Sequence, residues 1–194
     1  MPTFHTTYFG PVSWYAAIAN GGGAAISASE DYRKQTERNR CRIATANGVQ
    51  LLTVPVTLPP SAQGGKCPIR QVRISDHGNW RHLHWQALQA AYGMSPFFDY
   101  YADDLRPFFE KRWDYLFDYN MEITATMLRL LGINAEVTLT HDPVSLSCDD
   151  LGDSDIRYYQ TFQRRHGFLP GMSILDLLCN EGPESVLKLI DRKN

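Results

Sequence analysis

The chain has 194 residues, of which 43% are hydrophobic and 21% are charged, a composition typical of a globular protein. Its formal net charge of −2 argues against the broad positive surface that nucleic-acid binding requires. No apolar run approaches the roughly 18 residues of a membrane-spanning helix, and the pattern of a signal peptide is missing. Its four cysteines are widely separated and lack zinc-binding spacing. We therefore expect a cytoplasmic protein with free thiols, no membrane insertion and no metal site.

The chain opens with the pattern of a strand, a helix and a second strand. Residues 3–9 are rich in β-branched and aromatic side chains, and residues 24–28 are a short apolar segment, so each is expected to be a strand. Between them, Pro11 suits a first helical turn, and the glycines from Gly21 to Gly23 supply the stop. This order is the best local indication of an α/β core.

A hairpin and a loop are expected next. Asn47-Gly48 is a tight-turn signal between the apolar segments on either side of it. Residues 57–68 are rich in proline, glycine and serine and are expected to form a surface loop. The alternation of apolar and polar side chains in residues 69–75 predicts a further strand.

From residue 79 onward, the apolar side chains recur at helical spacing. Residues 79–93 and 95–131 are expected to be helical, with an interruption at Pro107, and residues 173–190 are expected to form two more helices. Residues 134–140 read as a strand between these helical regions. The apolar face expected for the first of these helices consists of Leu83, Ala87, Ala90 and Ala91.

Strands concentrate early in the chain and helices late, but their alternation permits a wound sheet. We expect an α/β fold with a Rossmann-like three-layer core, a mostly parallel sheet, a β-hairpin and a helical C-terminal part, with α+β as the alternative. Residues 1–194 are expected to form a single domain.

A basic cluster is the most distinctive local feature. Five cations lie within residues 33–42, opposed there only by Glu37. Because guanidinium groups bind phosphate or carboxylate bidentately, the cluster indicates an anion site. The alternative is that these arginines pair with acids of the same fold. The candidate substrate-binding residues in the cluster are Lys34, Arg38, Asn39 and Arg40.

Two further segments contain candidate site residues. His84 lies between tryptophans in a helical segment, where it is either a packing residue or, beside the cations, a general acid or base. Asp176 lies between leucines, so it needs a partner if it is buried, and an arginine of the basic cluster is the expected one. Ser173 is positioned to cap the helix that contains Asp176.

Three blocks carry a family resemblance: "KQTERNRCRIATANGVQLLTVPV", "NWRHLHWQALQAAYGMSPFFDYY" and "QTFQRRHGFLPGMSILDLLCNEGPESV". In these blocks, and from "TTYFGPVSWYAAI" onward, the chain resembles the WbqC-like protein family. It departs from the pattern at Cys41, where many members have asparagine, and at Thr6-Thr7, where longer relatives have Gln-Pro. The family's marked residues correspond here to Lys34, Arg38, Asn39, Arg40, Trp80, Arg81, His84, Ser173, Asp176, Asn180 and Glu181.

The resemblance implies a role in surface-polysaccharide or O-antigen biosynthesis. We expect a small cytoplasmic transferase that acts on an activated anionic small molecule, either a nucleotide-linked amino sugar or an acyl thioester, with no cofactor identified. Arg38 and Arg40 would hold the anion and His84 would transfer the proton, with Asp176 and Asn180 holding the cations in register. The alternative is a noncatalytic protein that binds an anion or a partner in glycan assembly. The expected partners are the anionic substrate and either a second copy of the chain or a protein of glycan assembly.

Overall fold

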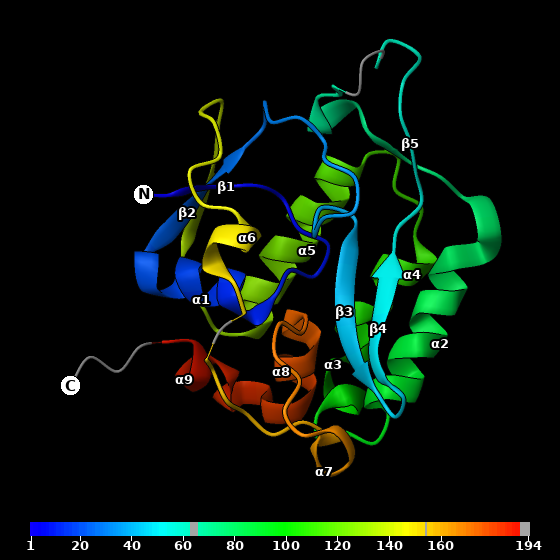
Figure 1. Ribbon diagram of the computed structural model, residues 1–194, viewed down its shortest axis with the longest axis vertical. Helices are drawn as coiled ribbons and strands as arrows, with labels where there is room; N and C mark the ends of the chain where they lie inside the picture. Colours follow the sequence, from blue (N-terminus) through cyan, green and yellow to red (C-terminus); the bar gives the residue numbers. More distant parts are fainter. Residues whose placement is uncertain (63–65, 154, 191–194) are drawn as a thin grey trace.

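A computed structural model describes residues 1–62, 66–153 and 155–190. In these ranges, helices are combined with three small sheets (Figure 1). The largest sheet is parallel, with the strand order β1-β2-β7 and with Ala25 of the central strand opposite Thr3 and Thr138. Its strands are β1 (Thr3–Phe4), β2 (Gly23–Ser27) and β7 (Glu136–Thr140).

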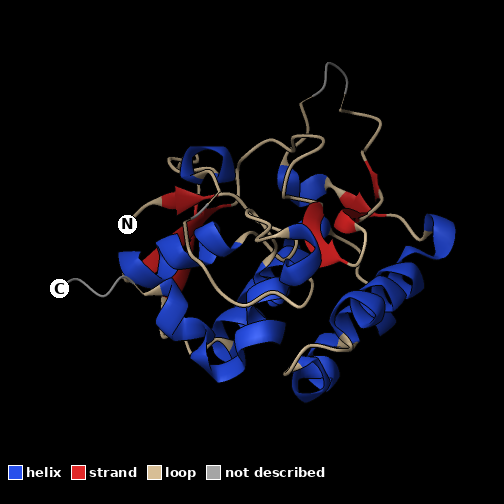
Figure 2. Cartoon of the chain, turned by 60° about the horizontal axis from the view of Figure 1, so that its bottom comes forward, coloured by secondary structure: helices blue, strands red, loops and turns tan. Residues whose placement is uncertain are grey.

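The other strands form two antiparallel pairs. Figure 2 shows these pairs separated from the parallel sheet, with helices between and below the two groups of strands. The fold is thus a mixture of helices and strands around a three-stranded parallel sheet, and the expected Rossmann-like three-layer core stays a prediction. The pairs are β3 (Arg40–Thr45) with β4 (Gly48–Thr53), and β5 (Val56–Thr57) with β6 (Arg73–Ile74).

Helices cover these sheets. α1 contacts β2 of the parallel sheet and also contacts α6, α8 and α9, whereas α2 and α8 contact β3. Within the described ranges, no helix has the length and apolar character needed to cross a membrane. The α-helices are α1 (Val12–Gly21), α2 (Trp80–Tyr92), α3 (Phe98–Leu105), α4 (Pro107–Glu110), α5 (Leu116–Leu130), α6 (Cys148–Leu151), α7 (Gln163–His166), α8 (Ile174–Glu181) and α9 (Ser185–Leu189). The described residues also form the short 3-10 helices η1 (Ile69–Gln71), η2 (His77–Asn79) and η3 (Gly182–Glu184).

Most of the local predictions are confirmed. The first helix is present, and Gly22 ends it in the left-handed conformation that glycine adopts without strain. The hairpin is also present, but its turn residues are Ala46 and Asn47, one position earlier than predicted, and Gly48 with φ 99° pairs with Thr45. Residues 134–140 and the two C-terminal helices follow the prediction closely.

Two local predictions are wrong in part, and a third includes residues that the structure does not describe. Only Thr3 and Phe4 of residues 3–9 are paired in the sheet, because the chain then turns into the core, where residues 5–10 are all buried. Residues 69–75 form η1 and the two-residue β6 instead of one strand, starting after Pro68. The predicted surface loop at 57–68 includes residues 63–65, which lie outside the described residues.

The predicted buried face of α2 is correct for Ala91, which is buried, but wrong for Leu83 and Ala90, which are exposed. Leu83 is 55% exposed, and the face of α2 that packs against the core carries the large ring side chains of the helix. Trp80 and His84 pack near Tyr119 and Tyr8, so large rings rather than small alanines set the orientation of the helix. The buried residues of α2 are Trp80, His84, Leu88, Ala91 and Tyr92.

Candidate functional site

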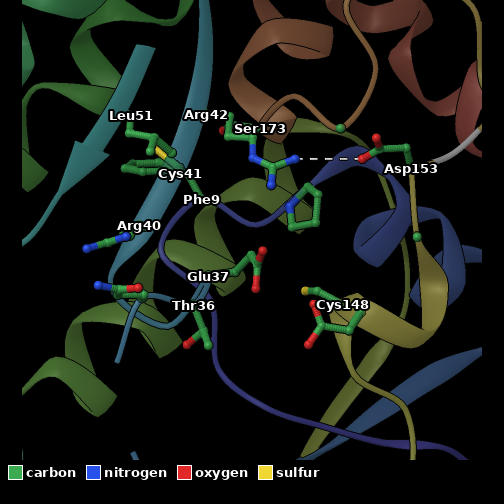
Figure 3. A pocket seen from close by; sticks show the side chains of 15 residues that line it. Phe9, Thr36, Glu37, Arg40, Cys41, Arg42, Leu51, Cys148, Asp153 and Ser173 are labelled. Atoms are coloured by element: carbon green, nitrogen blue, oxygen red, sulfur yellow. Dashed lines mark ion pairs between the residues drawn. The ribbon is translucent and has the colours of Figure 1, made fainter. Parts of the chain in front are cut away.

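A cavity of about 410 Å³ lies where the N-terminal segment, β3, α6 and the segment before α8 meet (Figure 3). Its size is in the range of small-molecule sites. Figure 3 shows Arg42 reaching across the cavity toward Asp153, with Glu37 and Cys148 on facing sides below. The lining residues used below are Phe9, Gln35, Glu37, Arg40, Arg42, Cys148, Asp149, Asp153, Gly171 and Ser173.

Backbone hydrogen bonds join the cavity walls. The Ile174 amide donates to the Gly10 carbonyl at 2.9 Å, and the Ser173 amide donates to the Arg42 carbonyl at 2.9 Å. Phe9 is fully buried with φ 43°, a conformation that is costly for a bulky residue and is held here by the surrounding rings. The walls are therefore fixed by contacts between segments far apart in the sequence.

Arg42 and Asp153 form a loose ion pair across the cavity. Their charged atoms are 3.8 Å apart, and the two side chains are 49% and 53% exposed. Gly171 passes so close that a Cβ there would lie 2.1 Å from an oxygen of Asp153. Because exposed pairs are held weakly, the Arg42 guanidinium is available to an incoming anion.

Glu37 and Cys148 face each other across the lower part of the cavity, and His5 lies behind them (Figure 3 shows the first two). The Tyr8 amide donates to the Glu37 carbonyl at 2.8 Å, which fixes the loop before β3 against the N-terminal segment. Burial raises the pKa of the Cys148 thiol well above its ordinary value. A thiol, an imidazole and a carboxylate thus meet at one end of the cavity.

A second, smaller cavity of about 330 Å³ adjoins the first, since Gln35 and Arg40 line both. Lys34 and Asn39 also line it, and its described lining contains two cations and no carboxylate. Arg40 has a buried Nε atom without a hydrogen-bond partner. Among the residues that the structure describes, no carboxylate lies within 4.0 Å of its guanidinium. This cavity therefore concentrates positive charge.

Arg38 does not share this environment. It is 5% exposed and its Nε and Nη2 atoms donate to Glu30, while Nη1 donates to Thr36 at 3.2 Å. The predicted pairing of Arg38 and Arg40 as one clamp is not observed. Arg38 lies in a turn that directs it toward Glu30, and extended structure begins only at Arg40. Asn39 is likewise buried, and its side chain donates to the Val54 carbonyl at 2.9 Å.

His84 does not line either of these cavities. It is buried, and its Nδ1 atom lies 2.8 Å from the Tyr8 hydroxyl. Burial lowers its pKa to about 4, opposed by the Thr53 carbonyl. Trp80 donates from Nε1 to the Ser75 carbonyl at 2.8 Å, and the Arg81 guanidinium lies over the Trp80 ring and pairs with Asp76. The predicted convergence of His84 with the arginines is therefore not observed.

The residues predicted to position the arginines bind residues 158–161 instead. Ser173 caps α8, as predicted, by accepting from the Leu175 amide. Asp176 is buried, as predicted, but it accepts from Tyr158 at 2.8 Å and from Gln160 at 2.7 Å rather than from an arginine. The remaining contacts bind the same segment: Asn180 accepts from Thr161, and Glu181 accepts from the Tyr159 amide.

We expect Asp176 to make the protein less stable as pH rises from about 4 to 6. Burial raises its pKa to about 6, opposed by the bonds from Tyr158 and Gln160, and its Oδ1 atom is buried without a hydrogen-bond partner. Between these pH values the folded state binds more protons than the unfolded state, so stability falls with rising pH. Through Asp176, the free energy of unfolding should fall by roughly 2–3 kcal/mol over this pH range. This fall should be absent in Asp176→Asn, which resembles the protonated acid.

The measurement is denaturant unfolding of both proteins from pH 4 to 6, with the exposed Asp149→Asn as control. Parallel stability curves for the wild type and Asp176→Asn would contradict the assignment.

Sequence reasoning did not identify three residues of the larger cavity: Glu37, Arg42 and Cys148. Arg42 was visible as a cation of the basic cluster, two positions after Arg40 on the same strand face. Glu37 was visible only as the single acid among those cations. Cys148 and His5 had no local signal, because their proximity depends on contacts between distant segments.

Comparisons with known proteins agree with the sequence blocks over most of the chain. The sequence model of the WbqC-like protein family matches residues 6–152. A relative from Mycobacterium tuberculosis (strain ATCC 25618 / H37Rv), uncharacterized protein Rv1507c, is 29% identical over 192 residues, which cover 79% of this chain and 81% of the relative. No solved structure gives a significant match. The family match includes the basic cluster and α2 but ends before Ser173 and Asp176, which the resemblance had included.

Proposed function

This chain belongs to the WbqC-like protein family, and from the two adjoining cavities we propose that it is a small transferase acting on an activated anionic small molecule. The observation that carries the proposal is the position of Arg40 between a cavity lined by cations and a cavity lined by reactive side chains. Following the family resemblance, we place this reaction in surface-polysaccharide biosynthesis.

The smaller cavity supports the anion-binding part of the proposal. Lys34 and Arg40 contribute positive charge, and Gln35 and Asn39 contribute polar groups beside it. The Arg40 guanidinium has no ion-pair partner within 4.0 Å among the described residues, so a ligand phosphate would not have to displace an acid. A phosphate held there positions the rest of the molecule toward the larger cavity.

The larger cavity supports the group-transfer part. Arg42 can leave its loose contact with Asp153 to meet charge that develops on a donor. Glu37 and Cys148 lie at the end of the same cavity. The two donor classes expected from the sequence, a nucleotide-linked amino sugar and an acyl thioester of coenzyme A type, both carry phosphate groups that Lys34 and Arg40 would bind.

The test is a thermal-shift and calorimetric screen of nucleotide sugars and coenzyme A thioesters. A donor that binds the folded protein raises its melting temperature by mass action. We expect Arg40→Ala to weaken the binding of that donor by at least tenfold, because one charge-assisted hydrogen bond is worth about 1.5–3 kcal/mol. The exposed Arg164→Ala, which lines neither cavity, should bind as the wild type does.

Two outcomes separate this proposal from its alternatives. A donor that binds but is not consumed in the presence of amino-sugar or sugar acceptors would favour the noncatalytic binding protein. If no phosphate-containing donor shifts the melting temperature at high excess, or if Arg40→Ala and Arg164→Ala bind equally well, the proposed anion site is wrong.

A further inference from the structure

Three side chains of metal-ligating type meet at the lower end of the larger cavity. One ring nitrogen of His5, one carboxylate oxygen of Glu37 and the sulfur of Cys148 all lie within 4.8 Å of one another. They come from three separate segments: the turn after β1, the loop before β3 and the first residue of α6. We propose that His5, Glu37 and Cys148 form a binding site for one divalent transition-metal ion of the zinc class.

The orientation of His5 supports this site. Its Nδ1 atom lies 2.9 Å from the Thr6 carbonyl, and a carbonyl can only accept, so Nδ1 carries the proton and Nε2 presents its lone pair. A backbone carbonyl bound to one ring nitrogen is the usual arrangement for a histidine that ligates through the other. The Cys148 amide donates to Nε2 over 3.2 Å, a long hydrogen bond that coordination of an ion would replace.

The donor set also selects the ion. Thiolate and imidazole favour zinc and similar ions over magnesium or calcium, and three protein ligands leave a fourth position open, as in catalytic zinc sites. Tetrahedral bonds of ordinary length would place the ligand atoms about 3.3–3.8 Å apart. Side-chain movements of about 1 Å would bring the three groups to that spacing from within 4.8 Å.

The local charges favour a cation at the thiol. The carboxylates of Glu37, Asp149 and Glu30 lie around the Cys148 thiol, and Arg38 is the opposing cation of this group. Arg38 is itself paired with Glu30, so the remaining charge of this group is negative.

Glu37 and Cys148 also line the larger cavity, so the open position of the ion would face a bound donor. There the ion would polarise a carbonyl or phosphoryl oxygen. This catalytic role rests on the proposed function, whereas binding of the ion does not.

The test titrates chelator-treated protein with Zn²⁺ by calorimetry in two buffers, and with Co²⁺ by absorption. We expect one ion per chain, release of about one proton from the thiol, and a cobalt–thiolate charge-transfer band in the near ultraviolet. Cys148→Ser should abolish the band and weaken binding by more than about 100-fold, beyond the 10–100-fold loss typical of an outer-shell partner. Cys67→Ser should keep the cobalt band and the wild-type affinity, because Cys67 is not part of the cluster.

Glu37→Gln provides a second test in case Cys148→Ser does not fold, since Glu37 is only partly buried and its replacement should disturb the core less. It should weaken Zn²⁺ binding at least tenfold, whereas the exposed Glu122→Gln, which lines neither cavity, should bind Zn²⁺ as the wild type does. The proposal is overturned if the wild type binds no ion in the micromolar range, or if the cobalt band persists in Cys148→Ser. Arg40→Ala should lose donor binding and keep the cobalt band, so failure of the anion site and failure of the metal site give different results.

Discussion

Replacing Arg38 with methionine is expected to lower the free energy of unfolding by about 3–5 kcal/mol, the cost of leaving one partner of a buried ion pair alone. The Arg38 and Glu30 side chains are each only 6% exposed, and two guanidinium nitrogens of Arg38 donate to the same Glu30 oxygen. Burial raises the pKa of Glu30 and its bonds to Arg38 oppose this, so removing Arg38 leaves an acid that favours protonation.

The control for this prediction is the double variant Arg38→Met with Glu30→Gln. It should regain most of the lost stability, because no unpaired charge remains in the buried site. Arg112→Met tests an exposed pair, in which Arg112 is 84% exposed and lies 3.5 Å from Asp76, and should change stability by less than about 1 kcal/mol. Urea unfolding measures all four proteins. If Arg38→Met keeps its stability but loses donor binding, Arg38 acts on the substrate, as the sequence had suggested.

Acidification from pH 6.5 to 4 is expected to destabilise the protein through His84 by about 3 kcal/mol. Burial lowers the pKa of His84 from 6.5 to about 4. In this window the unfolded chain binds a proton that the folded chain excludes, so this stability is complete above pH 6.5 and is lost as pH falls. His5, whose pKa is also lowered to about 4, contributes in the same direction, and Asp176 opposes both below about pH 6.

His84→Asn isolates this contribution, because an asparagine amide can still meet the Tyr8 hydroxyl that lies 2.8 Å from Nδ1. Its unfolding free energy should fall less steeply than that of the wild type between pH 6.5 and 4. The exposed His82→Asn, two residues away, should follow the wild-type curve. A wild-type curve that does not differ from that of His84→Asn would show that the ring accepts a proton without cost, and a catalytic proton-transfer role would then regain support.

Features that depend only on neighbouring residues could be predicted from the sequence. Proline and glycine set the ends of α1, the Asn-Gly pair set the hairpin to within one position, and Ser173 set the start of α8. These effects act over a few residues, through backbone conformation and capping, so they depend little on distant parts of the chain. The blocks that carry the family resemblance are likewise properties of the sequence, and the family match confirms them over residues 6–152.

Which of the charged and polar residues face a cavity depends on how distant segments pack, and no local pattern predicts it. Arg38 and Arg40 are two positions apart, yet one is sealed against Glu30 and the other lines two cavities, because extended structure begins between them. The orientation of α2 followed the packing of rings from Tyr8 and Tyr119, which no pattern within the helix encodes. His5, Glu37 and Cys148 come from three segments far apart in the sequence. Their side chains lie close together only after the core has packed.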